Sequence, residues 1–242
     1  RKIWRFVTDS KSTFEDHTEE SIKALAENAG HHFWLLERKR IVVSAIKQYL
    51  GEGDRFLDMG VGACDIAHDL RVLGVQLLLA DIQPQSLDIG AELGFEDLFQ
   101  FDIHKPIFRD HVNGVGVFDV LEHLDDDKTA VASLLQMVLP GGYIFVTVPA
   151  FQGLWNNRDV MERHKRRYSR RQLEKLFRSQ GADVLSCSYT FFSIFPLLVL
   201  RALQSRFRPR DAFRLEDYRS QFKINPHINR VLKMFTQLEE RW

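Results

Sequence analysis

Two glycines and an acidic residue have the spacing of a nucleoside-binding turn. Gly60 and Gly62 follow the apolar end of an expected strand at Phe56 and Leu57, and an expected helix begins just after them. Glycines at this point allow a sharp turn that aims backbone N–H groups and a helix N-terminus at a ligand. Asp81 follows Gly62 by about 20 residues, at the end of the next apolar run. In a doubly wound sheet this is the spacing of an acidic residue that binds a nucleoside ribose. The stretch therefore predicts a nucleoside site.

The same turn disfavours a dinucleotide. Cys64 or Asp65 stands where the dinucleotide fingerprint has its third glycine, so a pyrophosphate would lose its close backbone approach. Asp58, just before the turn, would repel a phosphate and would suit a positively charged ligand. These residues argue against a nicotinamide-dependent oxidoreductase. They favour a cationic nucleoside that carries no phosphate.

Two histidines are candidate proton acceptors. His123 follows the fourth expected strand and should face the ligand end of the sheet, whereas His164 lies in a long basic loop. Imidazole titrates near neutral pH, so either residue could take the proton of a hydroxyl acceptor. The structural alternatives are a helix-start histidine bonded to backbone at His123 and a solvated basic loop around His164.

The basic run around His164 has two interpretations. Four basic residues flank it: Arg163, Lys165, Arg166 and Arg167. A functional run would hold an anionic group of the acceptor, such as a phosphate or a carboxylate. A structural run would be a solvated face. Tyr168, which follows the run, is expected to pack the loop.

Strands and helices alternate along the chain around these residues. Strands are expected at residues 55–58, 76–80, 99–101, 112–118, 143–148 and 184–190. Helices are expected at residues 15–29, 37–50, 64–73, 84–93, 125–138 and 170–179, with a further pair in the C-terminal part. Residues 1 to about 12 are expected to be loose, and Ser169 to cap the helix after it. The rhythm predicts an α/β fold with a doubly wound, mostly parallel sheet covered on both faces.

The expected elements divide one domain into three parts. Residues 1–50 form an N-terminal helical cap, residues 51–150 the nucleoside-binding core, and residues 151–242 a lid loop, the sixth strand and C-terminal helices. Trp34 and Arg38 in the cap are expected to close over the ligand pocket, where Arg38 would pair with a carboxylate. Core packing is the alternative for Trp34.

Composition limits the partners and the compartment. The 242 residues carry 33 Lys and Arg against 33 Asp and Glu, so the net charge gives no argument for a nucleic-acid partner. Two cysteines without metal-ligand spacing fit a reducing compartment. The longest apolar stretch, residues 191–203, is too short to span a bilayer. We expect a cytoplasmic protein. Residues 191–210 would contact a membrane surface peripherally, or else cap the pocket or form a dimer face.

Four stretches in this order resemble the class I S-adenosylmethionine-dependent methyltransferases. They are Leu57–Gly62 (LDMGVG), Ala80–Ile82 (ADI), Phe118–Leu124 (FDVLEHL) and Leu139–Tyr143 (LPGGY). Residues 32–38 and 164–169 resemble a bacterial subgroup found near glycosyltransferases. The resemblance covers about residues 30–190. It implies a Rossmann-like methyltransferase fold, S-adenosylmethionine as cofactor and S-adenosylhomocysteine as product. The family's last antiparallel strand is not expected here, because residues 225–241 are helical in pattern.

The resemblance also implies a role for each matching residue. Asp58, Gly60 and Gly62 would line the methionine part, Asp81 would hold the ribose hydroxyls beside Ile82 on the adenine, Asp102 would accept from the adenine amino group beside Ile103, and Phe118 and Asp119 would lie near the sulfonium. Two of these acids have structural alternatives. Asp81 would also suit a helix cap, and Asp102 a loop turn.

Methyl transfer is the expected activity. The acceptor would be a small molecule or a lipid- or saccharide-linked group, methylated on oxygen. A non-catalytic protein that binds a nucleoside or a partner on the same fold is the alternative. Asp119, Glu122 and His123 also have a spacing that would suit Mg²⁺. No resident metal is expected, because the Glu-His pair is common in family members without metal.

Overall fold

The computed structural model describes residues 2–7, 19–206 and 224–239. Within these residues one six-stranded sheet has the order β1-β4-β3-β2-β5-β6, and every pair is parallel. The strands are β1 (Ile3–Arg5), β2 (Arg55–Met59), β3 (Gln76–Asp81), β4 (Leu98–Gln100), β5 (Val112–Phe118) and β6 (Val138–Thr147). The helices are α1 (Glu19–Asn28), α2 (Phe33–Lys47), α3 (Asp65–Leu70), α4 (Pro84–Glu92), α5 (Asp127–Met137), α6 (Asn157–Met161), α7 (Arg170–Ser179), α8 (Phe195–Arg206) and α10 (Pro226–Glu239).

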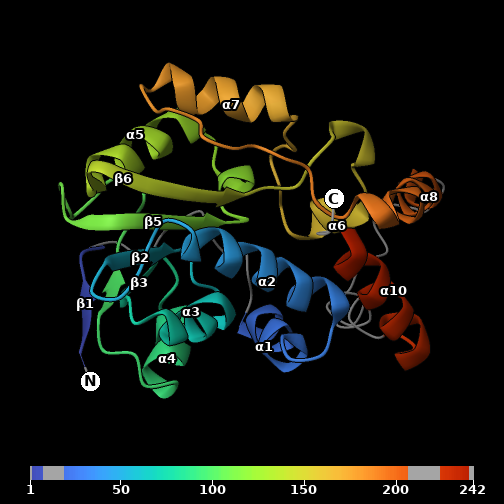
Figure 1. Cartoon of the computed structure of the whole chain (residues 1–242), viewed down its shortest axis with the longest axis horizontal. Helices are drawn as coiled ribbons and strands as arrows, with labels where there is room; N and C mark the ends of the chain where they lie inside the picture. Colours follow the sequence, from blue (N-terminus) through green and yellow to red (C-terminus); the bar gives the residue numbers. More distant parts are fainter. Residues whose placement is uncertain (1, 8–18, 207–223, 240–242) are drawn as a thin grey trace.

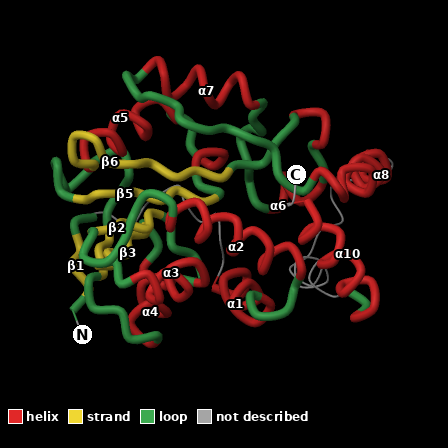
Figure 2. Tube along the Cα trace, in the orientation of Figure 1, coloured by secondary structure: helices red, strands yellow, loops and turns green. Residues whose placement is uncertain are grey.

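Alternate side chains of the central strands pack against opposite helical layers. Leu57 and Met59 of β2 share a buried cluster with residues of α5 and α7, whereas Phe56 packs with α2 and α3. Leu79 of β3 packs with residues of α3 and α4. Figures 1 and 2 show α5 and α7 on one side of the sheet and α2, α3 and α4 on the other. The doubly wound fold predicted from the alternation of elements is confirmed.

The strand order reverses between β2 and β5. The chain runs from β2 to β3 and β4 on one side, then crosses to β5 and β6 on the other. In open α/β sheets, ligands bind beyond the carboxyl ends of the strands at such a reversal. Gly60 follows β2 and Asp119 follows β5, so both lie at this crevice.

The N-terminal residues were expected to be loose, and that prediction is wrong for Ile3–Arg5. These residues form β1, which pairs in parallel with β4 from Ile3 opposite Leu98 to Arg5 opposite Gln100. Three residues at a sheet edge carry too little periodicity to be distinguished from a loop. The pairing is set by the neighbouring strand rather than by the segment itself.

The strand predicted at residues 184–190 is also wrong. Residues 182–190 have no regular secondary structure and join α7 to the short helix η4 (Phe192–Ile194), as the orange segment of Figure 1 shows. Leu185 is 65% exposed, and within the described residues β6 pairs with β5 alone. The alternating pattern of the segment suits a strand, but no adjacent strand edge engages it. The sixth strand of the sheet is therefore β1.

Two predicted boundaries shift, and one predicted helix cap is confirmed. The turn at residues 140–142 lies inside β6, where the β5–β6 register slips between Val112 and Gly114 and Gly141 has φ +80°. The loop predicted at residues 151–168 contains η3 (Gln152–Leu154) and α6. The cap predicted at Ser169 is confirmed, since its hydroxyl accepts from the backbone N–H of Gln172.

The N-terminus of α2 is held by a residue from the far end of the chain. His32 makes no side-chain cap for this helix. Instead, Asn229 of α10 accepts the Phe33 N–H at 2.9 Å and donates to the His31 carbonyl at 2.8 Å. Helix α10 is therefore fixed to the helix that forms one wall of the ligand crevice.

Candidate functional site

The turn after β2 depends on two glycines for different reasons. Gly60 has φ +84°, and a Cβ there would overlap Cγ2 of Val120. Gly62 has φ +51°, and a Cβ there would meet no atom within 4 Å. Gly60 is therefore required by packing, whereas Gly62 lies beside open space in the crevice.

Asp81 joins this turn to the one after β3. Its Oδ2 accepts the Gly62 N–H at 3.2 Å, and its Oδ1 accepts the Gln83 N–H at 2.8 Å. The carboxylate lies in the crevice with Ile82 beside it and is mostly buried. Carboxylate oxygens accept more than one hydrogen bond, so the same group can also hold two vicinal hydroxyls.

The crevice is acidic beneath the glycine turn. Burial raises the pKa of Asp58 to about 7, and the charges of Asp65 and Asp81 raise it further against the opposing effect of Arg38. Oδ2 of Asp65 is buried and has no hydrogen-bond partner among the described residues. The protein thus concentrates negative charge here without fully compensating it, which is suited to a cationic ligand.

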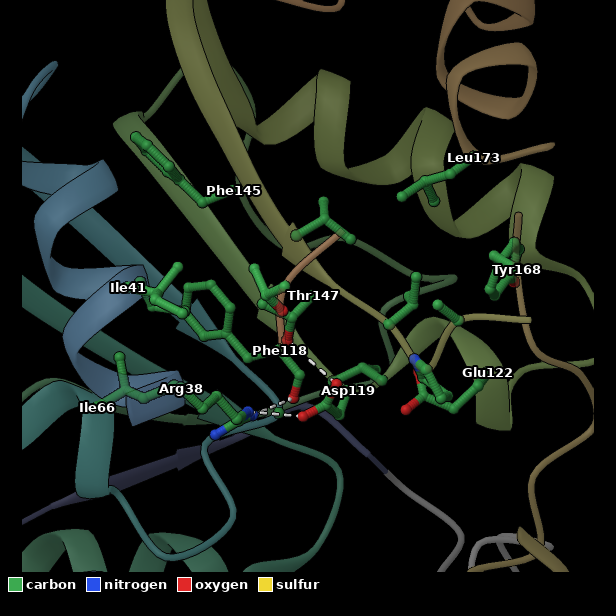
Figure 3. Close-up of a pocket in the computed structure, with 18 of the residues that line it drawn as sticks. Arg38, Ile41, Ile66, Phe118, Asp119, Glu122, Phe145, Thr147, Tyr168 and Leu173 are labelled. Carbon is green, nitrogen blue, oxygen red and sulfur yellow. Dashed lines mark hydrogen bonds and ion pairs between the residues drawn. The ribbon is translucent and has the colours of Figure 1, made fainter. Parts of the chain in front are cut away.

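Arg38 reaches from α2 across the crevice to the end of β5. Its Nε lies 2.7 Å from Oδ2 of Asp119, and its Nη2 donates to the Phe118 carbonyl at 3.2 Å. Asp119 has a left-handed backbone with φ +57°, and its Oδ1 accepts the hydroxyl of Thr147 at 3.1 Å. Figure 3 shows Arg38, Asp119 and Thr147 as one connected group. Arg38 is therefore engaged by a protein carboxylate.

The other predicted ligand-binding residues also line the crevice. Trp34 stacks on Phe191 with ring centroids 4.0 Å apart, so it closes the side of the pocket. Ile103 and Phe118 are almost fully buried, and most of their surface packs in the core. Oδ1 of Asp102 accepts the His104 N–H and lies 2.9 Å from the ring Nδ1 of His104. Asp102 thus has the turn-capping role that the sequence allowed.

The crevice opens into a cavity of about 1420 Å³. It runs from the glycine turn past Asp119 to the lid, and between β6 and residues 181–191. Pockets for one drug-sized ligand have volumes of about 300–1,000 Å³. The cavity therefore has room for a nucleoside and a second molecule.

The lid is organised around Asp159, which is fully buried. Arg167 approaches both of its oxygens, with Nε at 2.7 Å and Nη2 at 2.8 Å, and Nδ1 of His164 lies 2.9 Å from Oδ1. Asp159 also closes a capping box with Asn156 at the start of α6. The carboxylate is thus fully surrounded by donors.

The same arrangement keeps His164 charged. Burial lowers its pKa, but the hydrogen bonds of Asp159 and Glu162 outweigh burial and raise the pKa to about 9. Glu162 lies 3.2 Å from Nε2 of His164 and accepts from Arg158 at 2.7 Å, and these partners hold its pKa low despite burial. His164 is therefore an imidazolium at neutral pH.

The basic run next to His164 is paired with protein groups. Arg166 contacts Asp127 at 3.0 Å and donates to the carbonyls of Leu124 and Asp125, while Lys165 lies 3.3 Å from Asp125. Tyr168 is buried and donates to Asp127, so it packs the lid as expected. These contacts favour the structural interpretation of the run over a clamp on an anionic acceptor.

Glu122 and His123 follow Asp119 on the short helix η2 (Leu121–His123). Glu122 is fully buried, and burial raises its pKa well above the ordinary value, helped by the charge of Asp119. Neither of its oxygens has a hydrogen-bond partner among the described residues. The ring of His123 meets that of His164 edge-on, with centroids 4.8 Å apart. The two predicted catalytic histidines are thus neighbours.

A family model described as a methyltransferase domain matches residues 31–187. The match covers more than half of the chain and includes the glycine turn, Asp81, Asp119 and the lid. The chain belongs to this methyltransferase domain family.

Curated relatives of this methyltransferase-domain chain are distant. It is 24% identical over 102 residues to the ubiquinone biosynthesis O-methyltransferase of Xanthomonas oryzae pv. oryzae, a match that covers 39% of this chain and 43% of the relative. It is 28% identical over 100 residues to the protein of the same name from Aromatoleum aromaticum, covering 38% of this chain and 43% of the relative. The chain thus matches less than half the length of these relatives.

Solved structures share the fold at low identity. The phosphoethanolamine N-methyltransferase 2 of Haemonchus contortus, in complex with S-adenosyl-L-methionine, superposes with a TM-score of 0.62 at 16% identity, covering 93% of this chain and 54% of that one. The [4+2]-cyclase SpnF superposes with a TM-score of 0.62 at 16% identity, covering 84% and 86%. A SAM-dependent methyltransferase from Aquifex aeolicus gives 0.56 at 16% identity, covering 70% and 91%.

The crevice of this methyltransferase-domain chain fits S-adenosylmethionine in its chemistry. Asp81 suits the two ribose hydroxyls, and the space beside Gly62 admits a ligand backbone. The uncompensated charge at Asp58 and Asp65 suits the ammonium and sulfonium groups. Arg38 lines the same crevice and is paired with Asp119. Its guanidinium carries the charge that suits the carboxylate of the ligand.

Sequence reasoning missed three residues of the site. Asp159 and Glu162 were taken as parts of an irregular loop, and Arg158 was not considered. The Asn156-x-x-Asp159 spacing is that of a helix-start capping box, and this signal could have identified α6 and the buried aspartate within it.

Proposed function

We propose that the chain transfers a methyl group from S-adenosylmethionine to an oxygen of a small-molecule or lipid- or saccharide-linked acceptor. One observation carries this proposal: the acidic turn of Asp58 and Asp65 lies beside Asp81 in a cavity large enough for a second molecule. The methyltransferase domain family and the fold support the methyl-transfer part of this proposal.

The residues of the crevice would act mainly by positioning. When bound, the cofactor supplies an activated methyl group on a sulfonium, which is also the leaving group. Asp81 would hold the ribose, and Asp58 would balance the positive charge. Asp119, fixed by Arg38 and Thr147, would define where the acceptor meets the methyl group. Holding two reactants in line can lower the barrier of such a displacement by about 7–11 kcal/mol.

The acceptor hydroxyl must also lose a proton. His123 and His164 remain the proposed catalytic pair, with different parts. His164 is a cation held by Asp159 and Glu162, so it is a poor proton acceptor at neutral pH. His123 would then take the proton, and the His164 cation would orient the acceptor end of the cavity.

The choice of oxygen follows the printed names of the curated relatives, which are O-methyltransferases. A lipid-linked acceptor is supported by helix α8, which has two apolar faces. Ala202 is buried and Leu198 packs against the cluster that contains Ile194 of η4, whereas Leu197, Leu200 and Leu203 are 52%, 51% and 44% exposed. Among the described residues no helix is long and apolar enough to cross a membrane.

We propose that the outer face of α8 contacts a membrane surface. Sedimentation with anionic vesicles should pull down the parent chain, and the double variant Leu197→Glu, Leu200→Glu should stay in the supernatant. A control variant, Leu185→Glu, changes a leucine outside α8 that is more exposed than either of these. Equal sedimentation of all three chains would show that the face has another use, such as contact between copies.

Calorimetric titration with S-adenosylhomocysteine tests the cofactor. The parent should bind, and Asp81→Ala should bind about 100-fold more weakly, because two hydroxyl hydrogen bonds to a charged group and the tie to Gly62 are lost. Asp88→Ala, which changes an exposed aspartate of α4 that does not line the cavity, is the control. NAD should not bind. Failure of the parent to bind would overturn the cofactor assignment.

Transfer itself needs a separate assay. Release of S-adenosylhomocysteine from S-adenosylmethionine, in the presence of lipid-linked sugars, would establish the reaction. Binding without any transfer across an acceptor screen would instead support the alternative, a nucleoside- or partner-binding protein on this fold. The shared architecture with a [4+2]-cyclase shows that the fold alone does not decide this point.

A further inference from the structure

Arg201 brings a positive charge to the lid end of the cavity from outside the basic run. It belongs to α8, is exposed, and lines the cavity together with Arg158 of α6. Two elements far apart in the sequence thus place guanidinium groups at the same end of the cavity. We propose that Arg201 and Arg158 bind a phosphate or diphosphate group of the methyl acceptor. This inference rests on the proposed function, and it names the chemical class of the acceptor.

Aromatic and apolar contacts hold helix α8 against the lid. Phe195, its first residue, meets Phe151 edge-on, with ring centroids 5.6 Å apart. Leu198 packs against the buried cluster around Phe191. These contacts fix the inner side of the helix. Arg201 follows Leu198 by three residues, so it lies on nearly the same side of α8 and reaches the cavity.

The pKa values of two groups respond to the positive charge at this end. Desolvation lowers the pKa of Arg201, and the charge of Arg158 lowers it further against the opposing effects of Glu162 and Asp159. Burial lowers the pKa of His32 to about 4, and Arg158 and Arg201 are among the charges that lower it further. An environment that disfavours more positive charge favours an anion.

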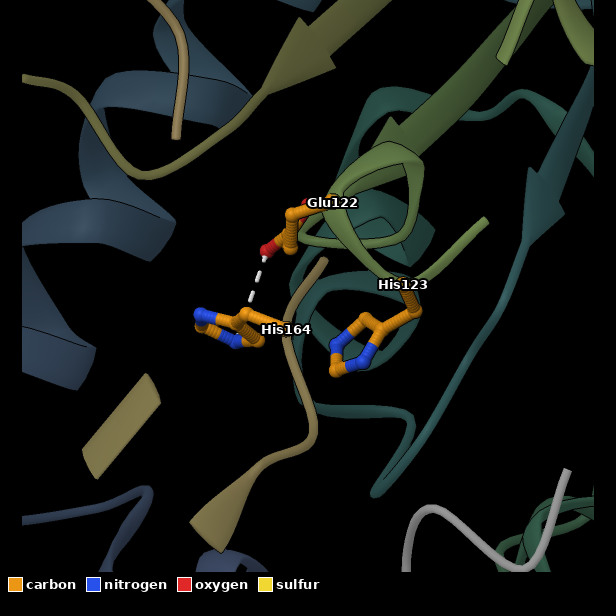
Figure 4. A group of neighbouring side chains, drawn as sticks. All are labelled: Glu122, His123 and His164. Atoms are coloured by element: carbon orange, nitrogen blue, oxygen red, sulfur yellow. Dashed lines mark ion pairs between the residues drawn. The ribbon is translucent and has the colours of Figure 1, made fainter. Parts of the chain in front are cut away.

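The charges at this end do not cancel among the described residues. Arg201, the groups whose charges act on it and the histidine that they hold are four cations and two ionised carboxylates: Arg158, His164, Arg167 and Arg201 with Asp159 and Glu162. A third carboxyl group, Glu122, is directed at the ring of His164 (Figure 4), with Oε1 4.0 Å from Nε2. Burial raises its pKa well above the ordinary value, so it contributes less negative charge than an ordinary glutamate. The lid end therefore has a surplus of positive charge.

The ion pair of Arg158 is compatible with this role. Its Nε donates to Oε1 of Glu162 at 2.7 Å, which fixes the guanidinium at the cavity wall. A guanidinium has five N–H donors in a planar fork, so it can hold a carboxylate and a phosphate together. Arg201 supplies the second positive charge that a phosphate dianion needs.

The exposed apolar face of α8 begins beside Arg201. Leu197 lies four residues before it on the same side of the helix, lines the cavity and is 52% exposed. A phosphate on an apolar chain would place its charge at Arg201 and its chain along Leu197. We therefore expect a lipid-linked phosphate. At the other end of the cavity Asp58 and Asp65 would repel the phosphate, which would orient the acceptor with its anionic group away from the cofactor.

Calorimetric titration of the full chain with farnesyl diphosphate, after saturation with S-adenosylhomocysteine, tests the site. The parent should bind, Arg201→Gln should bind at least tenfold more weakly, and Arg201→Lys should lose less affinity because it keeps the charge. Farnesol, which has the same chain without the diphosphate, should bind the parent at least tenfold more weakly. Arg178→Gln, which changes an exposed arginine of α7 that does not line the cavity, is the control and should match the parent.

Uridine diphosphate glucose separates the two sources of phosphate. Weaker binding than that of farnesyl diphosphate supports the lipid-linked source, whereas tighter binding would keep the phosphate site and overturn the lipid-linked source in favour of a soluble one.

Three results would overturn the site: a parent that binds neither diphosphate, equal binding of farnesol and farnesyl diphosphate by the parent, or an Arg201→Gln variant that binds the diphosphates like the parent. Arg201→Gln should bind S-adenosylhomocysteine like the parent, which shows that it is folded. Binding of farnesyl diphosphate without methyl transfer in an acceptor screen would instead overturn the proposed function and leave the phosphate site in place.

Discussion

The carboxylates at the two ends of the cavity are balanced in different ways. In the lid, Asp159 and Glu162 are buried against Arg158, Arg167 and His164, and their pKa values are lowered. In the crevice, the pKa of Asp58 is raised to about 7, and an oxygen of Asp65 has no partner among the described residues. In the lid the protein supplies cations that pair with the carboxylates, whereas in the crevice Arg38 is paired with Asp119 and offsets the charge of Asp58 only in part. Charge that the fold does not compensate thus marks the binding end.

The largest expected effect lies in the lid. Asp159→Asn leaves the Arg167 guanidinium without its buried counter-charge and removes one of the two carboxylates paired with the His164 ring. Breaking a buried ion pair in this way costs about 3–5 kcal/mol of the free energy of unfolding. Urea unfolding of the variant against the parent measures it, with the exposed Asp125→Asn as control. A cost below about 1 kcal/mol would mean that the lid charges are not a structural unit.

The crevice should respond to pH instead. The raised pKa means that the folded protein holds the Asp58 proton more tightly than the unfolded chain, so this group's contribution to stability is present below pH 4 and lost as the pH rises through about 7. The affinity for S-adenosylhomocysteine should change with pH in the opposite direction, because its ammonium group is attracted to the ionised carboxylate of Asp58. Affinity should rise about tenfold from pH 6 to pH 8.

Asp58→Asn is the variant that tests this assignment. Arg38, Asp65 and Asp81 are the charged groups that face Asp58, and the variant leaves all three in place. Its affinity for S-adenosylhomocysteine should be lower than the parent's and nearly independent of pH. A variant that keeps the full rise between pH 6 and pH 8 would place the titrating group elsewhere.

The smallest effect sharpens the comparison. Asp65→Asn removes one of the negative charges that raise the pKa of Asp58. The midpoint of the affinity rise should therefore move to lower pH, by less than about one unit. Repeating the calorimetric pH series on this variant measures the shift. A midpoint that moves upward would contradict the electrostatic account of the crevice.

The sequence predicted the elements whose structure is determined by their own residues. The strand at 112–118 is found as predicted, because a buried apolar run between turns has few alternatives, and Ser169 caps α7 through its own side chain. Ile3–Arg5 and residues 184–190 were assigned wrongly because strand formation depends on a partner edge. Periodicity describes the segment and not its neighbour.

The candidate site shows the same division. Asp58, Gly60, Gly62 and Asp81 gather at one turn as their spacing predicted, since adjacent parallel strands bring their ends together. The pairing of Arg38 with Asp119 was not predictable, because it joins elements far apart in the sequence. The pairing of Arg167 with Asp159 spans only eight positions, but it depends on how the lid folds around α6, which the sequence pattern did not show. For this reason the sequence allowed the basic run at residues 163–167 to be interpreted as a ligand-binding group, whereas the structure pairs it with protein carboxylates.

The clasp made by Asn229 has a consequence for the order of events in synthesis. Helix α2 begins at Phe33, but the side chain that receives its first N–H lies 196 positions later in the chain. A ribosome would release every strand of the sheet before it released this cap. The contact that caps the helix carrying Trp34 and Arg38 would thus form only after all the strands of the sheet had left the ribosome.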